Sequence, residues 1–408
     1  MEQFLEACHG DRSGSRRQEK ARVRTGSNYF AHHSGNCIWI LDGDILAPRW
    51  RQWRRAQFPC AGIGLDGTIG LVNAVSIEYV ELYTTDRKKT LDYFVSALGF
   101  TEKASAEDAD RHSSLLRQAE VTVVVTDGPI TEQFCATHGD GVADIGFRCA
   151  DPVLARESAL RAGAGPVAGH ADSVTVPGLG SVRHTMCPLS GGLPGDRDWI
   201  PVEDAGPSAS EGHVQRLDHL AVCLRPGTLA DTARFYAEAM GLEWFSSEFV
   251  EVGDQAMDSV VVRSPSGGVT FTMIEPVPDR APGQIDDFLA RNAGPGVQHL
   301  AFQVAEIIPA VREYRRRSAE FLKTPGTYYE ALERRIGTMP KQIQDLRETG
   351  VLVDRDENGH LLQIFSRSPH ERATLFYELI ERAGARGFGS ANIRALYEAV
   401  ERERGGSR

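Results

Sequence analysis

The sequence predicts an α+β protein made of two similar domains, each assembled from strand–helix–strand modules. Residues 77–100 resemble residues 217–242, because each stretch begins with alternating apolar residues and continues with apolar residues at helical spacing. A second similar pair, GVADIGF at 141–147 and GVQHLAF at 296–302, is also strand-like and is also followed by a helical pattern. Internal similarity over two such pairs indicates a duplicated fold rather than a single large core.

The elements of the first pair follow one another in the same order in both copies. The strand pattern comes first, and the helical pattern after it has apolar residues four positions apart, such as Phe94 and Leu98. Each predicted helix ends at a glycine, Gly99 or Gly241, where a left-handed backbone conformation costs little.

The domain boundaries are indicated by composition. Residues 188–213 are rich in Gly, Pro and Ser, which is typical of a linker. We therefore expect a first domain at 72–187 and a second at 214–408. Residues 1–71 have no counterpart in the repeats, and we expect a poorly ordered extension without a catalytic role. One version of this expectation is that translation naturally starts near Val72.

Composition excludes several classes of partner. The chain has 408 residues and a net charge of -11, which disfavours nucleic acid and anionic membranes as partners. It contains no run of about 18 apolar residues that could span a bilayer. The seven cysteines include no Cys-x-x-Cys spacing, so we expect a reduced cytoplasmic enzyme rather than a disulfide-bonded or zinc–thiolate protein.

Aligning the two copies locates a candidate metal site in the second domain. His219 aligns with Tyr79 on the first strand, and His299 aligns with Asp144 on the second. Glu378 lies in the apolar strand pattern TLFYELIER, where an unpaired carboxylate would be costly to bury. Coordination of a cation would offset that cost; an ion pair with a residue such as Arg382 is the alternative.

Two histidines and one carboxylate form the facial triad that holds iron(II) in oxygenases. Zinc hydrolases use the same ligand types, so the residues alone leave the metal open. His360 and His370 flank the turn-like dipeptides Asn358-Gly359 and Ser368-Pro369, and we expect them to be solvated.

Six segments resemble the 4-hydroxyphenylpyruvate dioxygenase family of the vicinal-oxygen-chelate superfamily. They are RLDHLAV, GVQHLAF, LFYELIER, TPGTYYEAL, DRDENGHLLQIF and GFGSANIRALYEAVERER. The resemblance extends from about Val75 to Arg404. It implies paired βαβββ modules that form open barrels, an inactive N-terminal barrel, and an iron(II)-binding C-terminal barrel with a C-terminal lid helix.

Within the family, HGDGVADI, GDQAMDSVVV, PGQIDDFL and FGSANIRALYEAVE resemble the 4-hydroxymandelate synthase branch. The homogentisate-forming branch has a proline and an asparagine on the strand that leads to Glu-Pro, where this chain has Thr272-Met273-Ile274. It also has phenylalanines on the C-terminal helix, where this chain has Ile393 and Tyr397.

The resemblance implies that 4-hydroxyphenylpyruvate and O2 are converted to 4-hydroxymandelate and CO2, as a step toward an aryl-glycine for a peptide antibiotic. The alternatives are homogentisate formation in tyrosine catabolism and a metal-free binding protein of the same fold; a homodimer is a candidate assembly. By position, the expected pocket residues are Ser259, Thr272, Ile274, Gln284, Gln298, Gln363, Phe365, Phe376, Phe388, Ile393 and Tyr397. The alternative for the phenylalanines is a place in the core.

The C-terminal helix also has a pattern of its own. Ser390 or Asn392 can cap its start, and an apolar stripe follows at helical spacing. We expect part of this stripe, Leu396 and Val400, to pack on the barrel.

Overall fold

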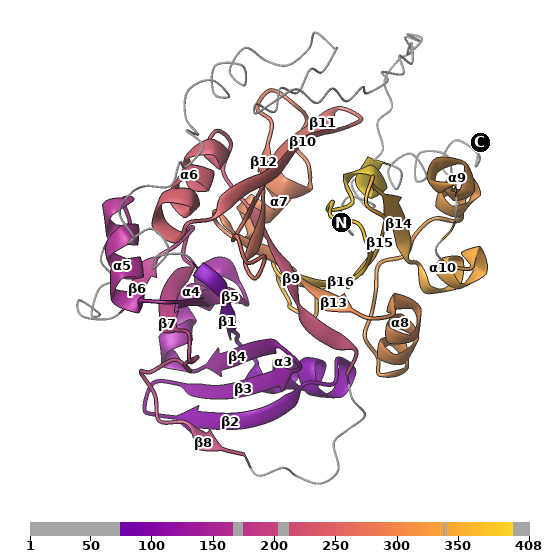
Figure 1. Ribbon diagram of the computed structural model, residues 1–408. Coiled ribbons are helices and arrows are strands. Elements are labelled where there is room, and N and C mark those ends of the chain that lie inside the picture. The colour runs from indigo at the N-terminus through magenta and orange to yellow at the C-terminus, as the bar shows by residue number, and fades with distance from the viewer. Residues whose placement is uncertain (1–73, 166–173, 203–211, 338, 340, 395–408) are drawn as a thin grey trace. The chain divides into compact units, whose positions relative to one another are not determined.

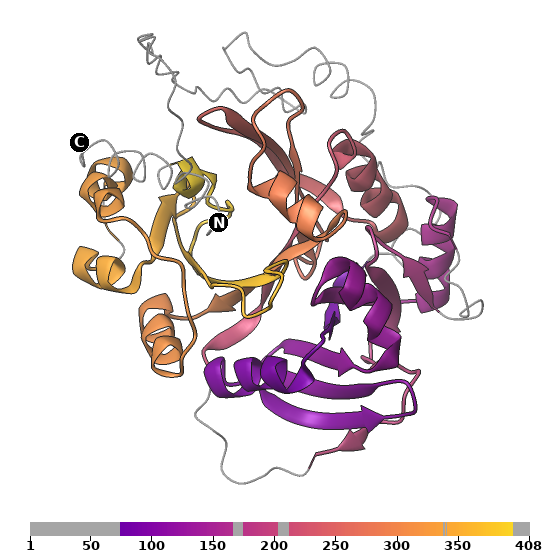
Figure 2. The ribbon, with the colours of Figure 1, turned by 180° about the vertical axis from the view of Figure 1, so that it is seen from behind.

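The structure is a computed structural model that describes residues 74–165, 174–202, 212–337, 339 and 341–394. The predicted extension at 1–71, together with Leu396, Tyr397 and Val400, lies outside these described residues. The described residues belong to one compact unit that contains two curved eight-stranded sheets flanked by helices (Figures 1 and 2). The predicted α+β class and the predicted duplication are confirmed.

The first sheet has the strand order β6-β7-β5-β1-β4-β3-β2-β8. Its strands are β1 (Ala74–Tyr83), β2 (Thr101–Glu107), β3 (His112–Gln118), β4 (Val121–Asp127), β5 (Gly141–Cys149), β6 (Thr175–Pro177), β7 (Arg183–Pro188) and β8 (Ile200–Pro201). The helices in this half are α3 (Arg87–Asp92), the π-helix η2 (Tyr93–Ala97), α4 (Pro129–His138) and α5 (Pro152–Arg161).

The second sheet has the strand order β10-β11-β12-β9-β13-β16-β15-β14. Its strands are β9 (Val214–Cys223), β10 (Glu243–Val252), β11 (Gln255–Arg263), β12 (Thr270–Pro276), β13 (Gly296–Val304), β14 (Leu352–Arg355), β15 (His360–Phe365) and β16 (Phe376–Ala383). Its helices are α6 (Leu229–Met240), α7 (Gln284–Arg291), α8 (Ile307–Arg316), α9 (Gly326–Ile336) and α10 (Ile343–Thr349).

Each sheet consists of two βαβββ modules whose first strands lie side by side. In the first sheet β1 pairs antiparallel with β5, and in the second β9 pairs antiparallel with β13. The last strand of such a module returns parallel to the first, as β4 does beside β1 and β16 does beside β13. The second module of the first sheet departs from this plan, because β8 pairs with β2 at the far edge.

The two sheets share their register at the positions that the sequence alignment equates. Tyr79 pairs with Gly146, and His219 pairs with Ala301 at the same place in the other sheet. Each pair of central strands also contains a β-bulge just before the aligned residue, at Glu78 in the first sheet and Asp218 in the second. The alignment of the copies is therefore a structural equivalence.

The segment predicted as a linker is partly built into the first sheet. Besides β8, it contributes Arg197, whose side chain is only 3% exposed and whose Nη1 lies 2.8 Å from Oε1 of the buried Glu81. Composition did not reveal this role, because the partner of Arg197 lies more than a hundred residues earlier in the chain. Residues 203–211 lie outside the described part.

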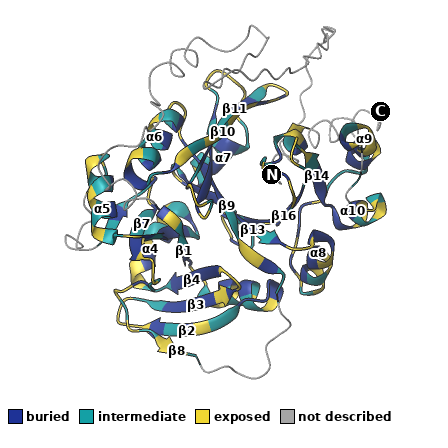
Figure 3. Ribbon diagram, viewed as in Figure 1, coloured by how far each residue is buried: buried dark blue, intermediate teal, exposed yellow. Residues whose placement is uncertain are grey.

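Burial follows the sheets. Figure 3 shows the central strands largely dark blue and most of the exposed residues on helices and sheet edges. Aromatic pairs join the two halves, for example Phe147 with Phe271 and Phe100 with Phe302, with ring centroids 6.2 and 6.0 Å apart. None of the helices in the described residues is long and apolar enough to cross a membrane.

Candidate active site

Two β-bulges direct the histidines of the second sheet toward one point. Asp218 is the extra residue before His219 on β9, and Gln298 is the extra residue before His299 on β13. A bulge lets two consecutive side chains point to the same face of a sheet. Asp218 Oδ1 accordingly lies 2.8 Å from Nδ1 of His219, and Gln298 Oε1 lies 3.2 Å from Nδ1 of His299. Because the preceding residue contacts Nδ1 of each imidazole, Nε2 of each imidazole is the nitrogen that remains available to a metal ion.

Glu378 completes the group from the next strand. It pairs with Ala301 across the parallel β13–β16 ladder, and Ala301 pairs in turn with His219. Its Oε2 lies 3.3 Å from Nε2 of His219 and 3.3 Å from Nε2 of His299. We call His219, His299 and Glu378 the triad; all three are buried, and their candidate ligand atoms lie within 4.8 Å of one another.

The electrostatics of the triad reflect its burial. Burial acts to lower the pKa of His219, but hydrogen bonds to Asp218 and Glu378 outweigh it and raise that pKa to about 9. Burial lowers the pKa of His299. Burial acts to raise the pKa of Glu378, yet its hydrogen bonds with the two imidazoles lower it, so this carboxyl group is ionised at neutral pH.

The donor set fits a divalent cation. Two imidazole nitrogens and one carboxylate oxygen on a common ion about 2.1 Å away would lie about 3 Å from one another, close to the contacts seen. Arg382, the ion-pair partner considered for Glu378, instead binds Asp218, with distances of 2.6 and 2.7 Å to its two oxygens. Among the described residues, the ion-pair contacts of Glu378 are with the two imidazoles.

The Asp218–Arg382 pair was not predicted from the sequence. Arg382 also donates to the carbonyl groups of Ala385 and Gly387, and its guanidinium lies 5.0 Å from the ring centroid of Phe388. These contacts connect the neighbour of His219 to the segment that leads into the C-terminal helix. The sequence signal for this pair was an aspartate directly before a candidate ligand. The β-bulge that turns Asp218 toward His219 cannot be recognised in the sequence.

Three predicted phenylalanines surround the imidazoles. Phe376 stacks on His299 with ring centroids 4.9 Å apart, and Phe365 meets the same ring at 6.0 Å. Phe388 meets His219 edge-on at 5.2 Å. The structure therefore brings all three rings to the triad, where they can exclude water from it.

Several other predicted residues lie on the same face of the sheet. Thr272 is in register with Ala221, which pairs with His299, so Thr272 faces the triad side. Ile274 lies two residues further along the same strand, opposite Ser259 of β11. Ile274 packs, together with Ile393, against an apolar cluster that consists of Val250, Val252 and Met257.

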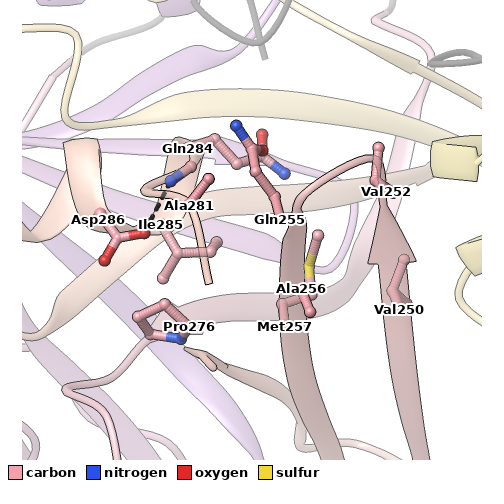
Figure 4. A pocket seen from close by; sticks show the side chains of 11 residues that line it. Val250, Val252, Gln255, Ala256, Met257, Pro276, Ala281, Gln284, Ile285 and Asp286 are labelled. Atoms are coloured by element: carbon pink, nitrogen blue, oxygen red, sulfur yellow. Dashed lines mark hydrogen bonds between the residues drawn. The ribbon is translucent and has the colours of Figure 1, made fainter. Parts of the chain in front are cut away.

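Gln284 lines a pocket in the second half of the molecule. The residue begins α7, and the pocket lies beside β10 and β11, with Gln255 next to Gln284 (Figure 4). The described lining of this pocket includes Val250, Val252 and Met257 of the apolar cluster but none of the triad residues. Gln363 is buried on β15, and its Oε1 lies 3.4 Å from Nδ2 of Asn392.

Two expectations about polar residues were wrong. His370 is buried rather than solvated: its Nδ1 lies 3.3 Å from Asp140 Oδ2, and its Nε2 lies 3.0 Å from the Tyr377 hydroxyl. The turn that contains it packs against the first half of the molecule, which local sequence could not show. His360 is half-buried. Asn392 does not cap the C-terminal helix, which begins at Ser390; its side chain is fully buried.

The equivalent place in the first sheet holds a different chemistry. Thr185 pairs with Gly146 as Glu378 pairs with Ala301, so Tyr79, Asp144 and Thr185 occupy the three triad positions. Asp144 Oδ2 accepts hydrogen bonds from the Tyr79 hydroxyl at 3.0 Å and the Thr185 hydroxyl at 2.7 Å. Burial raises the pKa of Asp144 to about 6. Asp144 Oδ1 is buried without a hydrogen-bond partner among the described residues, and the three side chains differ from the imidazole and carboxylate donor set of the second sheet.

Comparisons with known proteins agree with this arrangement. Residues 69–186 match the family model "Hydroxyphenylpyruvate dioxygenase, HPPD, N-terminal", and residues 216–364 match the "Glyoxalase/Bleomycin resistance protein/Dioxygenase superfamily" model. The 4-hydroxyphenylpyruvate dioxygenase of Coccidioides posadasii is 29% identical, with 80% of this chain and 92% of the relative covered. That of Pyricularia oryzae is 30% identical, with 65% and 69% covered.

A solved structure gives a higher identity. A triple mutant of 4-hydroxymandelate synthase from Streptomyces coelicolor is 48% identical, with 81% of this chain and 99% of the other covered and a TM-score of 0.72. The matched regions of this structure, of the two family models and of the relatives together include residues of both sheets. The chain belongs to the 4-hydroxyphenylpyruvate dioxygenase family of the vicinal-oxygen-chelate superfamily.

Proposed function

We propose that the protein is an Fe(II)-dependent 4-hydroxymandelate synthase. It would convert 4-hydroxyphenylpyruvate and O2 into 4-hydroxymandelate and CO2, a reaction whose atoms balance without another substrate. The observation that carries this proposal is the joint packing of Ile274 and Ile393 on the apolar cluster. These are two of the positions at which the chain departs from the homogentisate-forming branch. The 48% identity to a 4-hydroxymandelate synthase supports the same branch.

The triad would hold the iron. Two neutral imidazoles and one carboxylate leave three coordination positions open for a 2-oxo acid and O2, which is the arrangement used by non-haem Fe(II) oxygenases. When bound, the iron would activate O2 for oxidative decarboxylation and hydroxylation. Asp218 and Gln298 would fix the imidazole orientations through their contacts with Nδ1.

The remaining side chains would position the aromatic substrate. Phe365, Phe376 and Phe388 would enclose the ring and exclude water, while Thr272 and Gln363 offer polar groups to the phenol or the oxo acid. Ile274 and Ile393 would leave room for the benzylic carbon, rather than the ring, to approach the oxidant.

This assignment divides the molecule by role. We propose that residues 72–187 form a non-catalytic domain and that residues 214–408 form the iron-binding one, which the ranges of the two matched models support. A cytoplasmic location is supported by four cysteines in the described residues, Cys135, Cys149, Cys187 and Cys223, all of them free and buried.

Product identification tests the proposal. Purified protein loaded with Fe(II) would be given 4-hydroxyphenylpyruvate in air-saturated buffer. 4-Hydroxymandelate and homogentisate are isomers, so mass alone does not separate them, whereas chromatography against both standards does. We expect 4-hydroxymandelate as the main product, with one CO2 released per O2 consumed. Homogentisate as the main product would contradict the proposal.

The alternative activity is homogentisate formation, favoured by the names of relatives at 26–30% identity. A metal-free binding protein is disfavoured by the convergence of the triad. Metal analysis of the purified protein would decide that question: about one iron per chain is expected, and a folded protein unable to take up iron would support the binding-protein alternative.

A further inference from the structure

A short segment bridges the two edges of the second sheet. The edge strands are β10 and β14 (Figure 1). The segment Phe388–Ile393 contacts the β10 side directly and the β14 side through α9. Phe388 meets Phe245 of β10 with ring centroids 6.2 Å apart, and Ile393 packs on the apolar cluster of β10 and β11. Between them, Asn392 faces α9 and, through it, β14.

Asn392 is held by two side chains of α9. Its side chain is fully buried, and its Oδ1 lies 2.8 Å from the Tyr328 hydroxyl and 3.0 Å from Nη2 of Arg335. Nη1 of Arg335 also donates to the carbonyl oxygen of Ala391 at 3.0 Å. Both the side chain and the backbone of the first helical turn are thereby attached to α9.

The α9 residues are attached in turn to β14. The Tyr328 hydroxyl accepts from the backbone N–H of Val353 at 2.9 Å and from Arg335 at 2.6 Å. A phenol has one proton to donate, and the shortest acceptor contact of this hydroxyl is the one with Asn392. Buried hydrogen bonds of this kind specify one arrangement, because any displacement leaves a polar group unpaired.

The next residue, Ile393, faces a different surface from Asn392. Consecutive residues on a helix are about 100° apart, so a turn anchored through Asn392 presents Ile393 to a different surface. That surface is the apolar cluster, which also contacts Ile274. Apolar contacts have little directional preference, so they do not by themselves fix where Ile393 stands relative to Ile274.

We propose that Asn392, Tyr328 and Arg335 form a clamp that sets the position of Ile393 and thereby determines product choice. This inference rests on the proposed function and deepens it. The three residues are positioning residues, since they act on the substrate through Ile393. The clamp joins the β14 edge of the sheet to the β10 edge and so fixes the width of the space above the triad.

Adjacent tyrosines on α9 provide a matched test. Tyr328 and Tyr329 are both buried, and the hydroxyl of each lies 3.1 Å from a carbonyl oxygen of the neighbouring strand segment, Val353 or Val351. Only Tyr328 contacts Asn392. We expect Tyr328→Phe to lower the ratio of 4-hydroxymandelate to homogentisate at least about fivefold, and Tyr329→Phe to leave the ratio unchanged. Thermal stability would be measured for both variants, because the Tyr328 hydroxyl has more hydrogen-bond partners than that of Tyr329.

Substitutions of Asn392 give an independent comparison. Asn392→Asp keeps an oxygen that accepts from both partners and should retain the wild-type product ratio, whereas Asn392→Leu should shift it as Tyr328→Phe does. Iron content would be measured for every variant, and the amount of each product would be expressed per O2 consumed. Equal shifts in Tyr328→Phe and Tyr329→Phe, or folded clamp variants with an unchanged ratio, would overturn the proposal. A wild-type enzyme that forms mainly homogentisate would contradict the proposed function, and the difference between the two tyrosine variants would still decide the clamp.

Discussion

At the scale of single residues, the candidate metal site depends on neighbours that orient the triad. The three candidate ligands could be predicted from the sequence, because two histidines at equivalent strand positions and a carboxylate in an apolar strand form an unusual combination. Asp218 and Arg382 could not be assigned roles in that way. Their contact depends on a bulge in β9 and joins two residues that lie more than a hundred positions apart in the chain.

Removal of the Arg382 side chain should weaken metal binding. Arg382→Leu leaves the buried Asp218 carboxylate without its bidentate partner, and loss of a group that orients a ligand typically costs 10- to 100-fold in metal affinity. Iron dissociation constants from competition with a chelator would measure this. Arg386→Leu, in the same segment but with an exposed side chain, is the control and should keep wild-type affinity. Equal affinities in the two variants would contradict the role of Arg382.

At the scale of elements, the strands and helices of the repeats were well predicted and the C-terminal segment less so. Periodicity identifies a half-buried strand or an amphipathic helix because it reports a local environment. The role of Asn392 depends on α9 and β14, and the burial of His370 depends on packing against the first half. Neither partner is visible in the local pattern, so a helix cap and a solvated turn were expected instead.

Enlarging Ile393 should change product choice. Ile393→Phe, alone or with Ile274→Asn, places a ring where the apolar cluster now meets a branched side chain, and should divert a measurable fraction of product to ring hydroxylation. A complete switch is not expected, because overpacking usually costs about 1–3 kcal/mol and slows the enzyme. Chromatographic product ratios would be compared with those of Ile393→Leu, which conserves volume. Slower turnover at an unchanged ratio in all variants would argue against the idea.

At the scale of the whole molecule, one backbone plan supports two different sites. The central strands of both sheets share their register and bulges, yet Tyr79 and Thr185 bond to Asp144 where the triad stands in the other sheet. The sequence alignment identified Tyr79 and Asp144. The equivalence of Thr185 and Glu378 became visible only in the strand pairing of the structure. A sequence alignment misses it, because β7 follows β5 at a shorter distance along the chain than β16 follows β13.

The contact between the halves should make stability depend on pH. Nε2 of His184 lies 2.7 Å from the Tyr236 hydroxyl of α6, and burial lowers the pKa of His184 from 6.5 to about 4. The unfolded chain takes up this proton at a higher pH than the folded protein does. This contribution to stability is therefore fully present above pH 6.5 and is lost as the pH falls toward 4.

The expected loss is on the order of 3 kcal/mol. Denaturant unfolding measured between pH 4 and pH 7 would show a smaller slope for His184→Gln than for the wild type. Identical slopes for His184→Gln and the wild type would refute the assignment.

The most direct measurement is anomalous diffraction at the iron edge from crystals grown anaerobically with Fe(II). The account predicts one peak per chain, bound by Nε2 of His219, Nε2 of His299 and the carboxylate of Glu378. It predicts no peak among Tyr79, Asp144 and Thr185. An iron peak that lies away from the triad, or a second peak in the first sheet, would contradict the account.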